Sequence, residues 1–264
     1  MAGETHLSRS SSGSPPEVAE GVYRVGTRWI NFYLVEEEGE FTMVDAGYPR
    51  YWKHLAAAIE ALGTSMEAIQ AVILTHHHAD HAGTAQRLSS TAGTRVLVGA
   101  GDAWIVGGRY PSHANPGFYR QCWWRPSGIR FLAHSAAAGG ANYQPVKDVE
   151  ALSEDSILDL PGRPHVIHTP GHTAGHCSVA LEERGVLLSG DAMATFDYVT
   201  AKQGLGLHRF NDDRELALDS LERLDPTDAE VVLPGHGDPW TGGLRRALEI
   251  VRTAESDRNK PDAR

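Results

Sequence analysis

The stretch THHHADH, residues 75–81, follows directly on the apolar run AVIL. Four apolar residues are too few for a buried helix and are typical of a buried strand. Residues i and i+2 of an extended chain point to the same side, so His76 and His78 can bind one metal ion together. If a helix begins near Asp80, the side chains of Asp80 and His81 turn toward a second point close by. One short turn therefore predicts ligands for two ions, since imidazole and carboxylate are the ligands that zinc takes outside thiolate sites.

Three more residues of this kind follow predicted strands farther along the chain. They are His172 in PGHT, Asp191 in SGD and His236 in PGHG, and a glycine next to each allows the chain to turn tightly. With the four residues of the first stretch they make seven, which divide into two sets of three and one bridging carboxylate. A surface polyhistidine patch would not recur at the ends of distant strands, so a metal site is the favoured interpretation.

The remaining pattern alternates between strands and helices, in two similar halves. Such a pattern predicts sheets with helices on their outer faces. The helix over 212–224 is expected to place Leu216 and Leu221 on one face. Strands are predicted at 22–25, 31–35, 41–44, 71–74, 166–167, 178–181, 186–188 and 231–233, and helices at 52–62, from the His-rich turn to residue 88, at 212–224 and at 244–251.

The chain of 264 residues is predicted to form a single domain over 17–255. Residues 1–16 are rich in Ser, Gly and Pro and are expected to be a disordered tail, and 256–264 a charged one. Residues 101–150 lack clean periodicity but hold eight of the chain's 20 aromatic residues. We interpret this insertion as a lid over the site or as an interface.

Composition excludes several classes of protein. The net charge of −10 disfavours a nucleic-acid partner. No apolar run approaches the ~20 residues that a membrane span needs, and the polar first 20 residues do not read as a secretory signal. Cys122 and Cys177 are too few for a disulfide framework, so a cytoplasmic location is predicted, with Cys177 packing as a small apolar residue.

The motifs together resemble the metallo-β-lactamase superfamily over about residues 20–255. The pattern HxHxDH at 76–81 matches the signature of that family, and the three later ligands fall in its order and its sequence contexts. The resemblance implies an α/β fold, a four-layer αββα sandwich, with the metals in a cleft at one edge of the two sheets. It also implies two Zn²⁺ per chain, with Fe or Mn as alternatives, held by His76, His78 and His172 on the first ion and by Asp80, His81 and His236 on the second, with Asp191 bridging.

Asp45 stands at the end of the strand 41–44 and matches a buried acidic position of the family. We interpret Asp45 as a residue behind the ligands that holds a histidine tautomer or the metal-bound water. The alternative is a turn-forming role before Gly47.

The chemistry that the resemblance implies is hydrolysis. A hydroxide that bridges two metal ions attacks an ester, thioester or lactone carbonyl, so no GxSxG nucleophile motif is needed. Asp80 is the predicted proton acceptor. Tyr198, seven residues beyond Asp191, is the predicted donor to the oxyanion, although the spacing differs from that of related lactonases and packing is the alternative.

Departures within the family narrow the activity. Members that hydrolyse β-lactams commonly carry a different residue at the position of Asp191, so β-lactam hydrolysis is disfavoured. Members with a diiron redox centre carry Glu at the position of His78, so that class is disfavoured too. The run HTPGHTAGH, residues 168–176, resembles the glyoxalase II and lactonase branch. The main alternative is a mononuclear iron persulfide dioxygenase, which shares HxHxDH and the later His and Asp. The net charge of −10 disfavours a nuclease of the same fold. The complete set of ligand residues disfavours a non-catalytic binding protein.

The expected partner is a small molecule with a hydrolysable carbonyl. The aromatic residues of 101–150 favour an apolar or aromatic acyl group. A glutathione thioester would need basic residues, and nothing in the sequence orients the arginines of this segment, which are Arg109, Arg120, Arg125 and Arg130. Trp123 and Trp124 suit either a lid or the surface of a homodimer.

The other histidines have structural interpretations. His176 is predicted to be a hydrogen-bonded core residue, and His77 to point away from the metals. A surface position is predicted for His6, His54, His165 and His208. His113 and His134 lie in the aromatic segment, where a contact with the substrate is the less favoured alternative to a structural role.

Overall fold

The first sheet of the computed structural model, which describes residues 14–109, 116–152 and 156–258, runs in chain order. Its first four strands pair antiparallel, and β4 to β7 pair in parallel. The strands are β1 (Glu17–Ala19), β2 (Val22–Thr27), β3 (Ile30–Glu37), β4 (Glu40–Val44), β5 (Ile69–Leu74), β6 (Arg95–Gly99) and β7 (Val149–Leu152).

The second sheet has the order β14-β11-β10-β9-β8, and only β11 and β14 within it pair in parallel. A separate hairpin consists of β12 and β13. The predicted strands are confirmed, and β1, β6, β7, β8, β12 and β13 are additional. The bounds are β8 (Ser156–Ile157), β9 (His165–His168), β10 (Cys177–Leu181), β11 (Val186–Gly190), β12 (Met193–Asp197), β13 (Lys202–Leu207) and β14 (Val231–Pro234).

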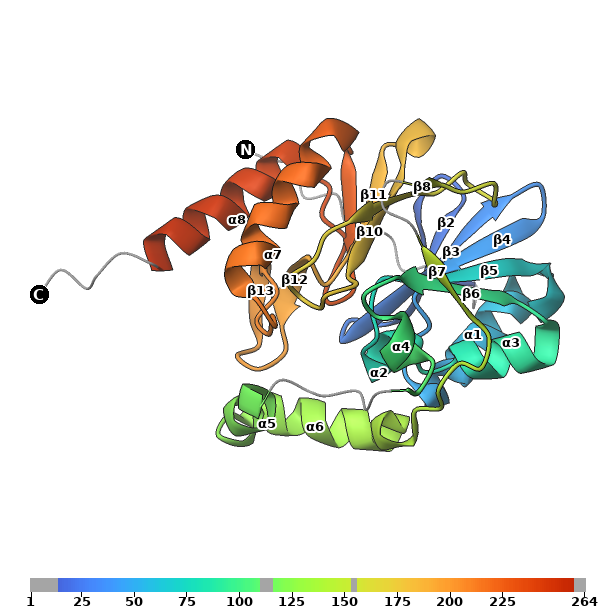
Figure 1. The fold of residues 1–264 in the computed structure, drawn as a ribbon, viewed down its shortest axis with the longest axis horizontal. Helices are drawn as coiled ribbons and strands as arrows, with labels where there is room; N and C mark the ends of the chain where they lie inside the picture. Colours follow the sequence, from blue (N-terminus) through green and yellow to red (C-terminus); the bar gives the residue numbers. More distant parts are fainter. Residues whose placement is uncertain (1–13, 110–115, 153–155, 259–264) are drawn as a thin grey trace, which may run out of the picture.

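Helices cover the outer face of each sheet, and the two sheets share one apolar core. Residues such as Ile73 of β5 and Val179 of β10 pack together between the sheets. Leu55 packs against the first sheet from outside and Leu248 against the second. The predicted four-layer αββα sandwich is thus confirmed (Figure 1). The helices are α1 (Trp52–Ala61), α2 (Ala79–Ala82), α3 (Ala85–Ala92), α4 (Ala103–Val106), α5 (Pro116–Trp123), α6 (Pro126–Ala138), α7 (Arg214–Ser220) and α8 (Leu244–Arg258), with 3-10 turns at Pro49–Tyr51, Met66–Ala68, Gly140–Asn142, Glu182–Arg184 and Leu221–Thr227.

Parallel pairing in both sheets brings the ligand-type residues to one edge. Asp45 follows β4 and His76 follows β5, and these two strands are parallel neighbours. In the second sheet Asp191 follows β11, and His236 follows its parallel neighbour β14. The carboxyl ends of parallel neighbours meet at the same edge of a sheet, so residues far apart in sequence converge there.

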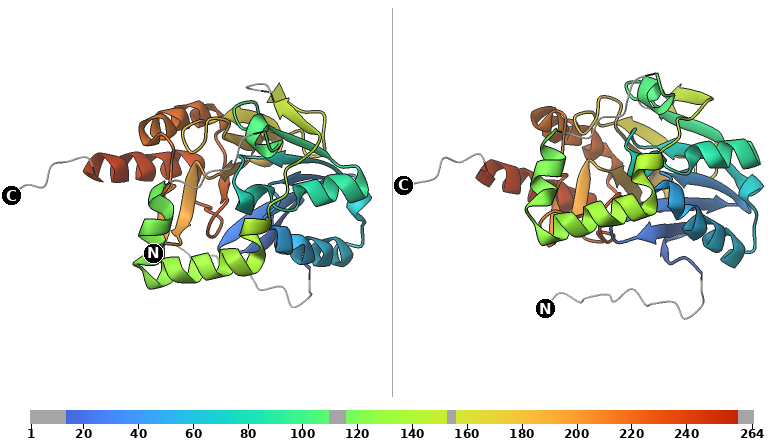
Figure 2. Two further views of the ribbon diagram at one scale, coloured as in Figure 1. Left: turned by 60° about the horizontal axis from the view of Figure 1, so that its bottom comes forward. Right: turned by 90° about the horizontal axis from the view of Figure 1, so that it is seen from below.

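The aromatic segment 101–150 is more helical than its sequence indicates. Helix α6 has a proline in its first turn and ends at Gly139, whose φ of 85° suits a glycine. At one end Ser127 Oγ donates to the carbonyl of Tyr198 over 2.7 Å, and at the other Arg50 donates to the carbonyl of Ala137 over 2.8 Å. Helix α6 therefore joins the two halves of the molecule along one side (Figure 2). Residues 110–115, which include His113, lie outside the described part.

Two predictions near the C-terminus need correction. Helix α7 ends at Ser220 and continues as a 3-10 turn that contains Pro226, because proline cannot supply the helical N–H. Leu216 is 42% exposed whereas Leu221 is buried, so the prediction that these two residues share one face is wrong, and Ala217 packs in the core with Leu221 instead. Helix α8 extends to Arg258, past the predicted start of the tail at 256.

At the N-terminus, residues 1–13 of the predicted tail lie outside the described part. Pro16, which was placed in that tail, accepts a hydrogen bond from the main chain of Arg24 over 2.9 Å. None of the described helices is long and apolar enough to cross a membrane.

Candidate metal centre

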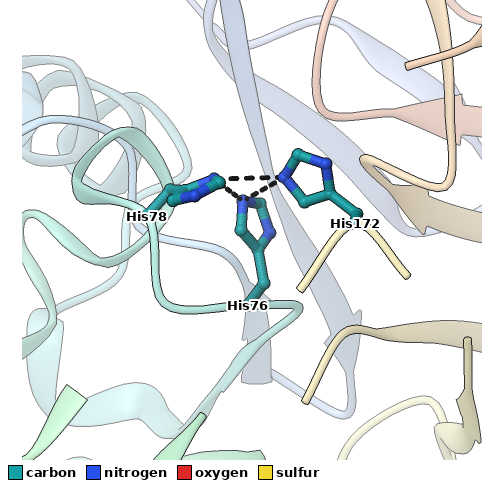
Figure 3. A group of neighbouring side chains, drawn as sticks. All are labelled: His76, His78 and His172. Atoms are coloured by element: carbon teal, nitrogen blue, oxygen red, sulfur yellow. Dashed lines mark hydrogen bonds between the residues drawn. The ribbon is translucent and has the colours of Figure 1, made fainter. Parts of the chain in front are cut away.

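Three histidine rings point their nitrogens at one another on one side of the site (Figure 3). His76 Nε2 lies 2.9 Å from His78 Nδ1, and His172 Nε2 lies 3.2 Å and 3.1 Å from those two atoms. Ligands at the usual zinc–nitrogen distance in a tetrahedral site stand about 3.3 Å apart. Burial lowers the pKa of all three rings well below 6.5, so each is neutral and offers a lone pair. These rings can hold one metal ion.

A second group lies beside the first and consists of Asp80, His81 and His236. Asp80 Oδ2 is 3.9 Å from His81 Nε2 and 3.7 Å from His236 Nε2. His81 Nδ1 donates to Asp45, and His236 Nδ1 donates to the carbonyl of Trp29. In a neutral ring the opposite Nε2 then carries a lone pair. With both rings neutral, as metal ligands must be, two lone pairs and a carboxylate face one point.

Asp191 lies between the two groups and contacts both. Its Oδ2 is 3.5 Å from His172 Nε2 and 3.2 Å from His236 Nε2, and its Oδ1 is 3.5 Å from His81 Nε2. His176 holds the residue in place, since its Nε2 accepts the main-chain N–H of Asp191 over 3.0 Å. The predicted role of His176 as a hydrogen-bonded core residue is confirmed, and the residue it supports is the central carboxylate.

The electrostatics of the second group call for a positive charge. Burial by itself would lower the pKa of His81, but the carboxylates of Asp191, Asp45 and Asp80 outweigh burial and raise it to about 10. His81 Nε2 and Asp191 Oδ1 are buried, and neither makes a hydrogen bond to any described residue. At such a pKa His81 carries a second proton in the metal-free protein, and a metal ion would take the place of that proton and supply the positive charge that the three carboxylates favour. The residues present therefore fit a metal ion.

Asp45 lies behind the site at the end of β4, in a backbone conformation with a φ of 62° that aspartate tolerates better than most residues. It accepts hydrogen bonds from His81 Nδ1 over 2.8 Å and from the hydroxyl of Thr75 over 2.9 Å. Because that hydroxyl donates to Asp45, it accepts from His76 Nδ1 over 3.0 Å. The sequence suggested that Asp45 holds either a histidine tautomer or the metal-bound water, and these contacts are of the kind that fix a histidine tautomer.

His208 is a site residue that sequence reasoning missed. We expected it at the surface, which is wrong: it is 4% exposed, and its Nε2 lies 3.4 Å from Asp191 Oδ2. Its Nδ1 donates to the carbonyl of Phe210 over 3.0 Å, which turns Nε2 toward the site. With His172 and Asp191 it forms a further group able to bind a metal. No ligand motif surrounds it in the sequence, because the chain after β13 brings it there.

Tyr198 lies at the same site. Its ring stacks on Phe131 with the centroids 3.9 Å apart, and its hydroxyl lies 3.5 Å from His208 Nε2. Burial, with Asp80 and Asp191 nearby, raises the pKa of the phenol well above 10, so it keeps its proton. The hydroxyl is therefore a donor next to the metal ligands.

A cavity of about 670 Å³ opens onto these residues. Its polar end contains side chains of the metal groups, together with His208. Its other walls are largely aromatic and come from α5, α6 and the loops beside them. The lining includes His78, Asp80, His172, Asp191, His208 and Asp212 on the polar side, and Tyr48, Phe118, Tyr119, Trp123, Phe131, Leu132, Tyr143, Tyr198 and Phe210 on the other.

Two facing sheets with a histidine and aspartate centre at one edge define a metallo-hydrolase type of protein. The model of the metallo-beta-lactamase superfamily matches residues 26–236, and the chain belongs to this superfamily.

Similar proteins agree with this assignment. The chain is 30% identical over 252 residues to the probable metallo-hydrolase YflN of Bacillus subtilis (strain 168), covering 89% of this chain and 91% of the relative. It also resembles the crystal structure of the metallo-beta-lactamase family protein TTHA1429 from Thermus thermophilus, with a TM-score of 0.65 and 27% identity, covering 91% of this chain and 81% of that one. The MIM-2 metallo-beta-lactamase, at 17% identity and a TM-score of 0.65 over 94% of this chain and 92% of that one, shares the fold.

Proposed function

We propose that this protein is a dinuclear zinc hydrolase that cleaves ester, thioester or lactone carbonyls of small molecules. The observation that carries the proposal is the position of Asp191, within 3.5 Å of ring nitrogens from both ligand groups. A carboxylate shared in this way is suited to bridge two cations. Fe and Mn are the alternative metals, because histidine and aspartate ligands accept them also.

In this proposal each ligand group holds one ion. His76, His78 and His172 would hold the first and Asp80, His81 and His236 the second, with Asp191 lying between the two groups. Two such ions would lower the pKa of water toward neutrality and polarise a carbonyl.

The chain's own side chains supply the rest of the chemistry. Asp80 lines the cavity, with its side chain 16% exposed, so it can accept a proton released there. The Tyr198 hydroxyl faces the same space with its proton retained and can donate to a substrate oxygen. Asp45 and His176 hold His81 and Asp191 in position from behind.

The deciding experiment is metal analysis of the untagged full-length protein by mass spectrometry, followed by an assay panel of esters, thioesters and lactones. About two zinc ions per chain, with hydrolysis that is lost in Asp191→Asn, would support the proposal. About one iron per chain, with oxygen consumption on glutathione persulfide and no hydrolysis, would replace it with the dioxygenase alternative.

The homodimer and the cytoplasmic location remain predictions. Cys122 and Cys177 are both buried and unpaired, which is compatible with a reducing compartment.

A further inference from the structure

We propose that the substrate carries an uncharged, apolar group beside the scissile carbonyl, and that the cavity rejects substrates with a carboxylate at the far end of that group. This inference rests on the proposed function, since it names the substrate class for the same site. It follows from what surrounds the cavity away from the metal groups.

The walls of the cavity are largely aromatic, beginning at Tyr198 beside the metal ligands and extending away from them. The rings of Phe131 and Tyr198 are stacked at 3.9 Å, and those of Phe118 and Phe210 meet edge to face at 5.1 Å. Leu132 of α6 continues this surface. Such walls gain free energy by burying apolar atoms and offer little to a charged group.

Among the described lining residues there is no lysine or arginine. Residues 110–115, which lie outside the described part and have the sequence YPSHAN, contain neither residue type. The three carboxylates that line the cavity, those of Asp80, Asp191 and Asp212, are on its polar side. A carboxylate at the far end of the substrate's acyl group would therefore meet apolar walls and no basic side chain among the described lining residues, which is an unfavourable arrangement.

The arginines near the cavity are engaged elsewhere. Arg209 donates to both carboxylate oxygens of Asp197 and to Gln121 of α5. Arg109 packs over the ring of Trp104, with 4.3 Å from the guanidinium carbon to the ring centroid. The other arginines of this segment are exposed and outside the lining, namely Arg120, Arg125 and Arg130. The structure therefore gives no basic anchor for the distal carboxylates of a glutathione thioester.

A matched pair of esters tests the inference on the full-length, metal-containing protein. 4-Nitrophenyl hexanoate and the mono-4-nitrophenyl ester of adipic acid have acyl chains of equal length and differ in one terminal carboxylate. We expect kcat/KM to be at least about tenfold higher for the hexanoate. Equal values, or a preference for the adipate ester, would overturn the inference.

Binding of the matched anilides, hexananilide and adipic acid monoanilide, gives a second readout by calorimetry. Preferential binding of the neutral anilide without cleavage of either ester would support the cavity's selectivity and contradict the proposed ester hydrolysis. Equal binding of the two anilides would overturn the inference whatever the esterase activity.

A charge introduced into the wall gives the sharpest control. Ala136 is an exposed position of α6 that lines the cavity, whereas Ala133 is exposed on the same helix and is not among the lining residues. Arginine has a high helix propensity, so neither Ala136→Arg nor Ala133→Arg should disturb α6. Ala136→Arg should raise kcat/KM for the adipate ester about tenfold relative to the hexanoate, and Ala133→Arg should leave the ratio unchanged. The same ratio in both variants would contradict the electrostatic explanation.

Discussion

The carboxylate of Asp45 accepts a hydrogen bond from Nδ1 of His81 over 2.8 Å, and through the hydroxyl of Thr75 it also fixes Nδ1 of His76. These two histidines belong to different ligand groups. A single buried residue, which contributes to neither group, therefore orients one ring in each. Groups of this kind keep the metal-facing nitrogen free of a proton and the ring in position.

Removal of Asp45 should weaken metal binding at both positions. Asp45→Ala leaves His81 Nδ1 without its acceptor and Thr75 without its partner. We expect affinity for zinc to fall by about 10- to 100-fold, as measured by competition with a chromophoric chelator. Asp238→Ala, which removes a surface ion pair with Arg24, is the control and should bind zinc normally. Normal zinc affinity in Asp45→Ala would contradict this role.

Loss of a proposed ligand should remove metal and activity together. His78→Ala takes one nitrogen from the first group, and Asp191→Ala takes the shared carboxylate. We expect most bound metal to be lost from both proteins, more completely for Asp191→Ala because both positions are affected. Metal per chain is determined by mass spectrometry, beside circular dichroism to check folding. Unchanged metal content in a folded variant would refute the ligand assignment.

Tyr198 should affect turnover without affecting metal. Tyr198→Phe keeps the stack on Phe131 and removes only the hydroxyl, so the fold and the metal groups should persist. We expect kcat to fall about 10- to 100-fold, in the range of a lost donor to an oxyanion. Steady-state kinetics and metal analysis of the same sample provide the test. A wild-type kcat would assign the residue to packing alone.

Gly235 should tolerate no side chain, because it touches the site directly. A Cβ there would stand 2.5 Å from Asp191 Oδ1 and 2.6 Å from His81 Cε1. Gly235→Ala should therefore displace these residues and lower metal content. Gly206→Ala is the matched control, since a Cβ at that position meets nothing within 4 Å. Equal metal content in the two variants would show that the site can shift to make room.

The metal-free protein should be most stable near neutral pH. Carboxylates overcome burial and raise the pKa of His81 to about 10, so its contribution to the free energy of unfolding is full below 6.5 and is lost as pH rises toward 10. Burial lowers the pKa of His176 to about 3, so its contribution is present above 6.5 and is lost as pH falls toward 3. Each group contributes a slope of roughly 1 kcal/mol per pH unit in its own window.

Urea unfolding in the presence of a chelator at pH 5, 6.5 and 8.5 measures the decline in the free energy of unfolding on both the acid and the alkaline side. His81→Gln should flatten the decline between pH 6.5 and 8.5 and leave the acid limb in place. A free energy of unfolding that rises from pH 6.5 to 8.5 in the wild-type protein would contradict the assignment for His81.

The sequence by itself determined the class of fold and most residues of the candidate metal centre. The signal was strong because ligand chemistry demands particular residue types at fixed spacings in residues 75–81, and because each later ligand follows a short apolar strand. Apolar runs and helical periodicity are properties of neighbouring residues, so they predicted sheets with helices on their outer faces, and the family resemblance implied the αββα layers.

Tertiary structure alone decided the residues whose role depends on what lies opposite them. His208 has no motif around it, and its part in the site comes only from the turn that sets its Nε2 against Asp191. The helices of 101–150 were hidden for a related reason, because α6 packs across both halves and its apolar positions follow those contacts more than one regular stripe. The lack of a basic residue in the cavity is likewise a property of packing, since the segment contains arginines and only the fold turns them away from the substrate.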